Sequence, residues 1–595
     1  MIATRLEDSA RSTAVQWGDE RLTYGELDAR AALIAGRLKA AGVGSGDYVG
    51  LYLDRGGEMV AAILGILKLG AAWVPLDPAY PRDRMSWILA DSGATILLTS
   101  RARSGELAGA GVREILIDDT TAVEPAATEP VEPDTPAYLI YTSGSTGQPK
   151  GVIITHGNLS HYGTAITDAI DLQPSDRYLH TASLAFSSSV RQLFAPLLTG
   201  ACVVIARRAE IADPRELLQV CRRARVTVID LVPSYWARLT EAAEGDPSLL
   251  SGSTLRLTLS ASEPLPSALV QRWLALTGGA TRFINMYGQT ETAGIVSTVT
   301  LTPSLLAEGT VAPLGLPLPR TEIHLLDEAG APVPDGTAGE IWIGGDAVGP
   351  GYHNRPDLPA QRFVDHPAAN RRLYRTGDLG LRRPDGLLTF TGRRDNQLKV
   401  RGHRVEVEEV EATLQRHPQV TAAAVQAREH QGEAALVAFV TSANGAPPTA
   451  RELREHLLRS VPEYMVPAAF QVLPALPRTP NGKLDRGALA SLEVTFGADR
   501  AAYVAPRSDA ERAMARIWEE VIGVSPVGVH DHFFEIGGHS LLAVKVFRRL
   551  ADATSVPLAL TDVFRFPTVR TFAAHLATAE RPAMVPTEAA APTGA

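Results

Sequence analysis

The sequence AYLIYTSGSTGQPKGVIIT, residues 137–155, places a loop rich in Gly, Ser and Thr between two apolar runs. Both flanking runs are short and apolar, so the pattern predicts a strand, a loop and a second strand. A nucleotide-binding P-loop would end in Gly-Lys-Ser/Thr and lead into a helix, whereas here Pro149 precedes Lys150 and Gly151 follows it. Glycines, hydroxyl groups and a lysine nevertheless suit a polyphosphate, because they allow close backbone approach and supply donors. Taken alone, the loop is equally typical of a flexible turn.

The chain before this loop alternates helix and strand signals. Thr23 and Glu26 have capping-box spacing ahead of an amphipathic run, which predicts a helix there. Residues 59–76 form the most apolar run, but Lys68 interrupts it and Pro75 lies near its end. That run therefore suits a buried helix followed by a strand better than a membrane span. The alternation predicts a layered α/β architecture with a substantially parallel sheet.

Composition narrows the class of protein. The 595 residues are 45% apolar and 21% charged with a net charge of -9, which is ordinary for a globular protein. This charge gives no reason to expect nucleic acid or a membrane as partner. Cys202 and Cys221 form no disulfide framework or CxxC pair, and the N-terminus lacks the apolar core of a signal peptide, so we expect a cytoplasmic location. Four histidines lack a convincing zinc-ligand context and receive no role: His156, His161, His530 and His532.

Four further stretches follow the loop in a fixed order: NMYGQTETAG (285–294), YRTGDLG (374–380), GRRDNQLKVRG (392–402) and PRTPNGKLDR (477–486). Together with the loop they resemble the signature series of the adenylate-forming enzymes, and more closely an adenylation domain of a nonribosomal peptide synthetase. The stretch DHFFEIGGHSLLAVKVFRRL (531–550) resembles the phosphopantetheine attachment motif of a peptidyl carrier protein. Taken by itself, Ser540 in that stretch also fits a plain helix N-cap.

The resemblance implies a large α/β N-terminal adenylation subdomain, a small α+β C-terminal subdomain and then an all-α four-helix carrier domain. We expect the N-terminal subdomain at 1–394, the mobile C-terminal subdomain at 395–500, a linker at 501–509, the carrier domain at 510–580 and a disordered tail at 581–595. We place the boundary near Asp395 because charges cluster there. We place the linker at 501–509 because the segments after it have helical patterning.

Site residues follow from the resemblance position by position. The implied ATP-binding residues are Thr142, Ser143, Ser145, Thr146, Gly147, Lys150, Asn285, Tyr287, Thr290, Asp378 and Arg393. Glu291 is expected to help hold Mg²⁺, Lys483 to be catalytic in adenylate formation, and Asp395 to be the hinge. Ser540 is the implied attachment site of 4'-phosphopantetheine. Gln289 stands where many peptide-synthetase domains have proline, which puts only the stiffness of that loop in doubt.

The substrate pocket is the least conventional part of the resemblance. Its implied positions are Ser187, Ser188, Arg191, Asp230, Leu259, Ala261, Met286, Gly294 and Ile295. Family members that activate α-amino acids normally carry an aspartate for the substrate ammonium where this chain has Ser187. Three alternatives follow for the opposite charges: Asp230 receives an amine placed elsewhere on the substrate, Arg191 holds a second acidic group, or the two form an ion pair in a polar pocket for a hydroxy, keto or aryl acid.

These residues predict activation of a carboxylic acid with ATP and Mg²⁺, and its loading onto a fused carrier. A non-standard amino acid is the favoured substrate, with a hydroxy, keto or aryl acid as the alternative. An acyl-CoA ligase and an inactive docking scaffold are the competing functions. Expected partners are the small acid, a phosphopantetheinyl transferase, and a condensation, ketosynthase or tailoring enzyme in trans.

Overall fold

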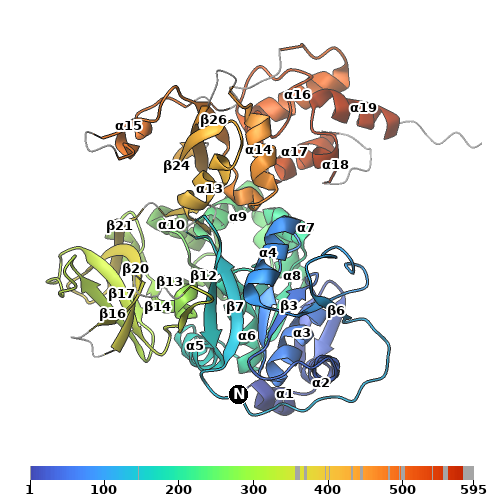
Figure 1. The fold of residues 1–595 in the computed structure, drawn as a ribbon, viewed down its shortest axis with the longest axis vertical. Coiled ribbons are helices and arrows are strands. Elements are labelled where there is room, and N and C mark those ends of the chain that lie inside the picture. The colour runs from blue at the N-terminus through green and yellow to red at the C-terminus, as the bar shows by residue number, and fades with distance from the viewer. Residues whose placement is uncertain are drawn as a thin grey trace, which may run out of the picture. The chain divides into compact units, whose positions relative to one another are not determined.

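The computed structural model describes residues 2–144, 147–355, 362–366, 371–395, 397–400, 402–430, 433–442, 447–479, 483–494, 496, 503–538, 540–553 and 561–579. The chain forms two compact units (Figure 1). The first consists of residues 1–414 and 456–466, and the second of residues 415–455 and 467–595. The predicted domain boundaries stay predictions, but the segment just after Asp395 packs with the first unit.

A nine-stranded sheet forms one layer of the first unit, with the order β15-β14-β13-β12-β11-β9-β10-β1-β2. The strands from β1 through β13 along this path are parallel, and antiparallel strands lie at both edges. Their bounds are β1 Thr13–Trp17, β2 Glu20–Thr23, β9 Arg177–His180, β10 Cys202–Ile205, β11 Val228–Leu231, β12 Leu257–Ser260, β13 Arg282–Gln289, β14 Gly294–Leu301 and β15 Leu316–Pro317.

A seven-stranded sheet forms a second layer, with the order β18-β8-β7-β4-β3-β5-β6. Its bounds are β3 Tyr48–Tyr52, β4 Ala72–Pro75, β5 Ile96–Thr99, β6 Arg113–Leu116, β7 Pro136–Thr142, β8 Lys150–Thr155 and β18 Gly351–Tyr352. Strands β7 and β8 are antiparallel neighbours with Thr142 opposite Lys150, so the predicted strand, loop and strand are confirmed.

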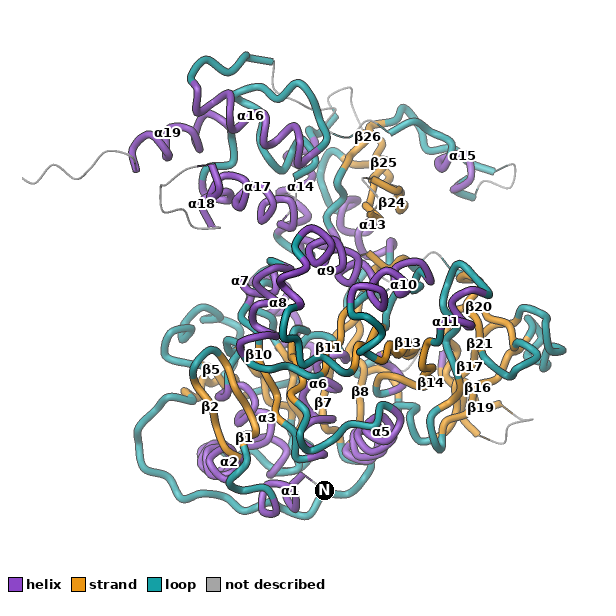
Figure 2. The backbone as a smooth tube through the Cα atoms, turned by 180° about the vertical axis from the view of Figure 1, so that it is seen from behind, coloured by secondary structure: helices purple, strands orange, loops and turns teal. Residues whose placement is uncertain are grey.

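Helices lie between these sheets and on their outer faces. Helices α3 (Gly57–Lys68), α5 (His156–Ala169) and α6 (Ser187–Thr199) each contact strands of both sheets or side chains from them. Trp73 of β4, for example, stacks on Phe194 of α6 with ring centroids 5.7 Å apart. Helices α8 (Pro214–Arg223), α9 (Pro233–Gly245) and α10 (Ser267–Leu276) pack on the outer face of the nine-stranded sheet (Figure 2). Helix α4 (Arg82–Ser92) packs on the seven-stranded sheet.

The predicted local signals are present in the first unit. Thr23 and Glu26 form a capping box at the start of α2 (Tyr24–Ala40), with the backbone N–H of each bonded to the side chain of the other. Residues 59–76 form the buried part of α3 and then β4, as expected. Across the residues that the structure describes, no helix combines the length and apolarity needed to cross a membrane. Shorter helices complete this unit: α1 Ile2–Asp8, α7 Arg208–Ala212, α11 Pro303–Ala307 and the 3₁₀ turns η1 Pro247–Leu250, η2 Thr290–Thr292 and η3 Glu463–Met465.

Smaller sheets follow in the chain. A five-stranded sheet contains β16 Thr321–Leu326, β17 Gly339–Gly345, β19 Phe363–His366, β20 Arg371–Arg382 and β21 Leu388–Arg393, and a two-stranded ribbon contains β22 Leu398–Val400 and β23 His403–Val405. Helix α13 (Val407–Gln415) then begins. The next helix, α14, spans Ala450–Leu458.

The second unit contains a three-stranded sheet and the carrier helices. The sheet is formed by β24 Val420–His430, β25 Glu433–Ser442 and β26 Ala469–Val472, and is followed by helix α15 at Arg486–Ala490. The carrier region contains α16 Asp509–Ile522, α17 Ser540–Ala553, α18 Thr561–Arg565 and α19 Val569–Ala579, which enclose one apolar core around Trp518 and Phe572. The predicted all-α carrier is therefore confirmed.

Candidate active site

The phosphate-loop candidate joins β7 to β8, and its glycines are required by geometry. A Cβ at Gly144 would lie 1.9 Å from the carbonyl oxygen of Gln148, and Gly147 has φ of +78°. Side chains larger than hydrogen are therefore excluded or strained at these two positions. Thr142 Oγ1 lies 3.5 Å from the Lys150 carbonyl oxygen. The predicted residues Ser145 and Thr146 lie outside the described residues.

Lys150 and Glu291 form the charged centre next to this loop. The Lys150 ammonium is buried and lies 3.9 Å from Glu291 Oε1 and 3.5 Å from Glu406 Oε1. Burial, together with the charge of Arg404, lowers the pKa of Lys150 to about 8. Burial alone would raise the pKa of Glu291, but the charges of Arg404 and Lys150 lower it to about 2. Glu291 is therefore an ionised carboxylate at neutral pH.

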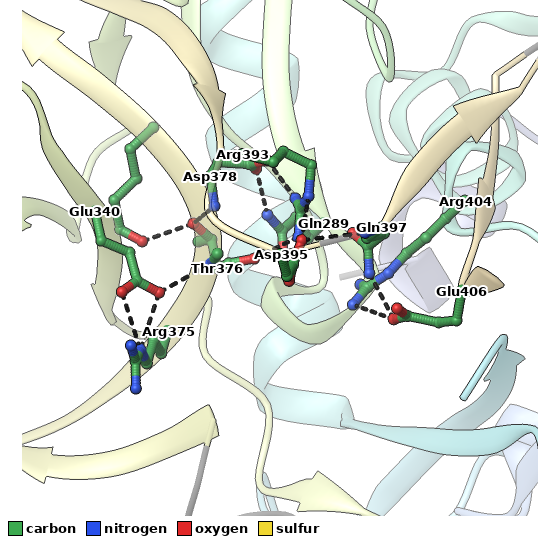
Figure 3. A network of polar contacts seen from close by, with 12 residues as sticks. Gln289, Glu340, Arg375, Thr376, Asp378, Arg393, Asp395, Gln397, Arg404 and Glu406 are labelled. Atoms are coloured by element: carbon green, nitrogen blue, oxygen red, sulfur yellow. Dashed lines mark hydrogen bonds and ion pairs between the residues drawn. The ribbon is translucent and has the colours of Figure 1, made fainter. Parts of the chain in front are cut away.

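A second cluster gathers several of the expected ATP-binding residues around Asp378 (Figure 3). Tyr287 Oη and Gln289 Nε2 each donate to Asp378 Oδ2 at 2.8 Å. The other oxygen of Asp378 accepts from Arg393, which in turn bonds Asp395 at 2.7 and 2.8 Å. The sequence-predicted Tyr287, Asp378, Arg393 and Asp395 are thus brought together. An ionised carboxylate at this place would accept hydrogen bonds from a diol strongly.

The remaining nucleotide residues lie on the β13 and β14 side of the site. Asn285 is buried and donates from Nδ2 to the Pro313 carbonyl at 2.7 Å. The Thr290 hydroxyl lies 3.2 Å from the hydroxyl of Ser187. Two neutral hydroxyl groups therefore lie where an aspartate at position 187 would place its carboxylate.

The charged pocket residues form a buried ion pair. Arg191 of α6 donates to Asp230 Oδ2 of β11 from Nε at 2.9 Å, and its Nη2 lies 2.7 Å from the same oxygen. Tyr178 Oη and Gln192 Nε2 also donate to Oδ2, at 3.2 and 3.4 Å. Although burial alone lowers the pKa of Arg191, the net shift is well upward, mainly because of the charge of Asp230. All of these contacts are made to Asp230 Oδ2.

The other pocket positions are mainly apolar and buried. Tyr162 of α5 adds a residue that the sequence did not indicate, because its Oη lies 3.3 Å from Arg191 Nη1. Gly294 has φ of +133°, and a Cβ there would meet the Tyr162 ring at 2.6 Å, so this position requires glycine. Ser188 lies on α6, while Leu259, Ala261, Met286 and Ile295 belong to the main apolar core.

Lys483 and Ser540 belong to the second unit. Lys483 is exposed there, and its carbonyl accepts from Thr479 N at 2.7 Å. Ser540 is the first residue of α17, as predicted. Two residues before it, a Cβ at Gly538 would lie 2.3 Å from the Phe533 carbonyl oxygen, so the approach to the helix requires glycine.

Comparisons with known proteins decide the family. The model of the AMP-binding enzymes matches residues 2–353, that of the AMP-binding enzyme C-terminal domain matches 409–483, and that of the phosphopantetheine attachment site matches 512–576. The chain belongs to the AMP-binding enzymes. This membership indicates an adenylate-forming ligase with ATP and Mg²⁺, joined to a domain that carries 4'-phosphopantetheine.

Similar proteins come from nonribosomal peptide synthesis. The dimodular nonribosomal peptide synthase of Bacillus subtilis (strain 168) is 40% identical over 577 residues, which is 95% of this chain and 23% of that protein. Tyrocidine synthase 1 of Brevibacillus parabrevis is 36% identical over 564 residues, 93% of this chain and 50% of that protein. The chain therefore spans half or less of the length of these relatives.

Solved structures share the fold over most of the chain. A nonribosomal peptide synthetase protein with adenylation and carrier domains, solved with a vinylsulfonamide inhibitor, has a TM-score of 0.81 at 26% identity, covering 97% of this chain and 96% of that one. The o-succinylbenzoate CoA synthetase of Bacillus subtilis has a TM-score of 0.74 at 28% identity, covering 83% of this chain and 99% of that one. The predicted family resemblance and fold class are thereby confirmed.

The residues present fit the cofactors that the family implies. Mg²⁺ is usually held by one or two carboxylates together with substrate phosphates. Glu291 offers one ionised carboxylate beside the phosphate loop, which matches that pattern. No group of three His, Cys, Asp or Glu side chains suited to a protein-only metal site occurs among the described residues.

Sequence reasoning missed several residues of this site. Arg404, Glu406, Glu409, Arg84 and Tyr352 all contact predicted residues or one another. The stretch after residue 402 carries the only local signal, because its charges alternate with apolar positions before α13. Arg84 shares the buried face of α4 with Ile88, four residues later, but a charge at such a position is not visible as buried from periodicity alone.

Proposed function

We propose that this protein activates a carboxylic acid with ATP and loads the acyl group onto its own carrier domain. The observation that carries the proposal is that one chain contains both the adenylation residues and a carrier domain. The first unit holds the phosphate loop, Glu291 and the Asp378 cluster, and the second presents Ser540 at the start of a carrier helix. The family match and the carrier-containing relatives support this combination.

In the first half-reaction, an oxygen of the substrate carboxylate attacks the α-phosphorus of ATP, the bond to the bridging oxygen breaks, and pyrophosphate leaves. Two anions must approach each other, so preorganised positive charge is needed. Lys150 would neutralise phosphate oxygens at the loop, and Lys483 would bridge the carboxylate and the α-phosphate. Glu291 would hold Mg²⁺, which neutralises part of the phosphate charge.

In the second half-reaction, the acyl group leaves AMP for the carrier. The phosphopantetheine arm on Ser540 supplies the thiol that receives the acyl group as a thioester. Asp378 would keep the ribose of the adenylate in place through its hydroxyls, since its own side chain is fixed by Tyr287, Gln289 and Arg393. Asp395 is held by Arg393 and by Arg362 at 3.0 Å. It would be the hinge about which the C-terminal subdomain moves between the two half-reactions.

We further propose that the substrate is an acid whose distal end is uncharged and which has no α-ammonium in the conventional position. Ser187 faces Thr290 with a hydroxyl, and a buried ammonium without a charged partner costs several kcal/mol. Asp230 is held by Arg191 and two further donors, which favours the ion-pair alternative over capture of a displaced amine. A net-neutral pair suits a hydroxyl, carbonyl or amide at the distal end of a hydroxy, keto or aryl acid.

ATP–pyrophosphate exchange across α-amino, β-amino, hydroxy and aryl acids tests both proposals. Exchange with any acid supports the adenylation function, and an absence of exchange with all four classes would favour a docking scaffold. Strong preference for an ordinary α-amino acid would overturn the substrate proposal alone. Intact-protein mass spectrometry after pantetheinylation distinguishes loading on the carrier from ligation to free coenzyme A.

The partners and location extend this proposal. A phosphopantetheinyl transferase would modify Ser540, and a condensation, ketosynthase or tailoring enzyme would take the acyl group onward in the cytoplasm. The carrier match supports the first of these directly, because an attachment site requires an enzyme that modifies it.

A further inference from the structure

Tyr162 of α5 fills a space beside the proposed acid pocket that a side chain at position 294 would otherwise occupy. The ring is buried, and its atoms Cζ and Oη would lie 2.6 and 2.7 Å from a Cβ added to Gly294. Helix α5 contacts both α6 and β14, the elements that carry Arg191 and Gly294. Glycine at position 294 therefore does not widen the pocket, because α5 supplies the wall that β14 lacks.

The hydroxyl group of Tyr162 meets the buried ion pair of the pocket. Its oxygen accepts a hydrogen bond from Arg191 Nη1 at 3.3 Å, while Arg191 Nε and Nη2 lie 2.9 and 2.7 Å from Asp230 Oδ2. A guanidinium group can only donate, so the tyrosine oxygen must be the acceptor in this contact. Arg191 is thereby held by an anion through two of its nitrogens and by a neutral hydroxyl group through the third.

This arrangement leaves the hydrogen of the Tyr162 hydroxyl group for another acceptor. A phenol carries one hydrogen as well as lone pairs, and the contact with Arg191 uses only a lone pair. The side-chain hydrogen bonds found among the described residues include none in which Tyr162 donates. Tyr178 differs, because its Oη donates to Asp230 Oδ2 at 3.2 Å. Of these two buried tyrosines, Tyr162 is the one that keeps a donor for a ligand.

We propose that Tyr162 is a specificity-determining residue, whose hydroxyl group donates to an acceptor oxygen at the distal end of the acid. This inference rests on the proposed function, because it places the acid between the pocket positions given there. The ring limits the size of the acid beside Gly294, and the hydroxyl hydrogen selects a keto, ether or hydroxyl oxygen over a hydrocarbon group. A buried donor that finds no acceptor costs free energy, so a hydrocarbon acid of the same shape binds less well.

Exchange kinetics with pairs of acids of matched shape test the hydrogen bond. The first pair is levulinate and isocaproate, which replaces a keto oxygen by a methyl group. The second pair is para-methoxybenzoate and para-ethylbenzoate, which replaces an ether oxygen by a methylene group. ATP–pyrophosphate exchange by the full chain gives the ratio of kcat/KM within each pair for wild type, Tyr162→Phe and Tyr138→Phe. Tyr138→Phe is the matched control, because Tyr138 is also buried but its Oη donates to the Ala293 carbonyl at 3.5 Å.

We expect wild type to prefer the oxygen-bearing acid of a pair and Tyr162→Phe to lower that preference about tenfold, as for the loss of one hydrogen bond between neutral groups. Tyr138→Phe should keep the wild-type ratio. Loss of the contact between Tyr162 and Arg191 changes exchange with both acids of a pair alike, so the ratio reports only the hydrogen bond to the substrate.

The variant Tyr162→Leu tests the ring. Removing the ring opens space beside Gly294, so the preference for para-butoxybenzoate over para-methoxybenzoate should rise at least about tenfold in kcat/KM. Thermal unfolding, measured for each variant, shows whether it is folded.

An unchanged ratio within both pairs in folded Tyr162→Phe would overturn the hydrogen bond, and no gain of the larger acid by folded Tyr162→Leu would overturn the role of the ring. Exchange by wild type with other acids but with neither oxygen-bearing acid would also overturn the inference. Failure of the proposed function is a separate result, because wild type would then show no exchange with any acid.

Discussion

The Arg191–Asp230 pair allows a direct test of the substrate class. Both side chains are 3% exposed, and Arg191 Nη2 lies 2.7 Å from Asp230 Oδ2. The substitution Asp230→Asn keeps the shape of the side chain but leaves Arg191 as a buried cation without a counter-charge. Breaking such a pair on one side costs about 3–5 kcal/mol. An acid with a second, distal carboxylate would offset part of that cost by binding to Arg191.

We therefore expect Asp230→Asn to shift the preference between two matched acids. The shift should be away from a neutral monoacid and toward its analogue with a distal carboxylate. A hydrogen bond to a charged group contributes about 1.5–3 kcal/mol, which corresponds to roughly 10- to 150-fold in relative kcat/KM. ATP–pyrophosphate exchange with both acids measures this ratio for wild type and variant. Thermal unfolding, measured in parallel, gives the stability cost.

The double variant Arg191→Met/Asp230→Leu is the control, because it removes both charges and should gain nothing for the diacid. If Asp230 instead holds an amine of the substrate, wild type will prefer an amine-bearing acid and Asp230→Asn will lose that acid selectively. That result, or an unchanged ratio in the folded single variant, would refute the interpretation of the pocket as a neutral ion pair.

Three further outcomes concern the two half-reactions. Lys483→Ala should raise the barrier to adenylate formation by about 3 kcal/mol, which slows that step roughly a hundredfold, with far less effect on transfer from a supplied adenylate. Equal losses in exchange and single-turnover transfer would contradict its role. Ser540→Ala should keep exchange and abolish covalent loading in intact-protein mass spectra, and loading at any other residue would argue against it. Because the pKa of Lys150 is lowered to about 8, its ammonium loses its proton as pH rises through that value, so kcat/KM for ATP should fall above about pH 8. A pH profile of Lys150→Arg, whose guanidinium stays charged, should lack that fall.

Local patterns predicted the elements well where short-range physics decides them. The capping box of Thr23 and Glu26 depends on residues three apart, and the strands on either side of the phosphate loop depend on contiguous apolar runs. The start of α17 at Ser540 likewise follows from a local change in pattern. In each case, the deciding interaction lies within one element or between neighbouring elements.

Long-range charge pairing could not be predicted in the same way. Arg84 and Glu409 are separated by 325 positions, and each alone is typical of a solvated helix residue. Their burial depends on α4 and α13 meeting beside the loop, which no periodicity encodes. The sequence did indicate that Arg191 and Asp230 share a pocket, but only the structure places their charged atoms 2.7 Å apart.

The buried charges of the first unit divide into fixed and exchangeable pairs. Arg191 and Asp230 lie on α6 and β11, so both belong to the scaffold and their pairing shapes the pocket. Lys150 and Glu291 lie on β8 and η2, whereas their partners Arg404 and Glu406 lie on β23 and directly after it. Since a buried charge must keep a partner, the second group can change only by exchanging one partner for another. On the proposed scheme, the fixed pair governs which acid enters, whereas Lys150 and Glu291 can exchange Glu406 and Arg404 for the charges of the phosphates and Mg²⁺.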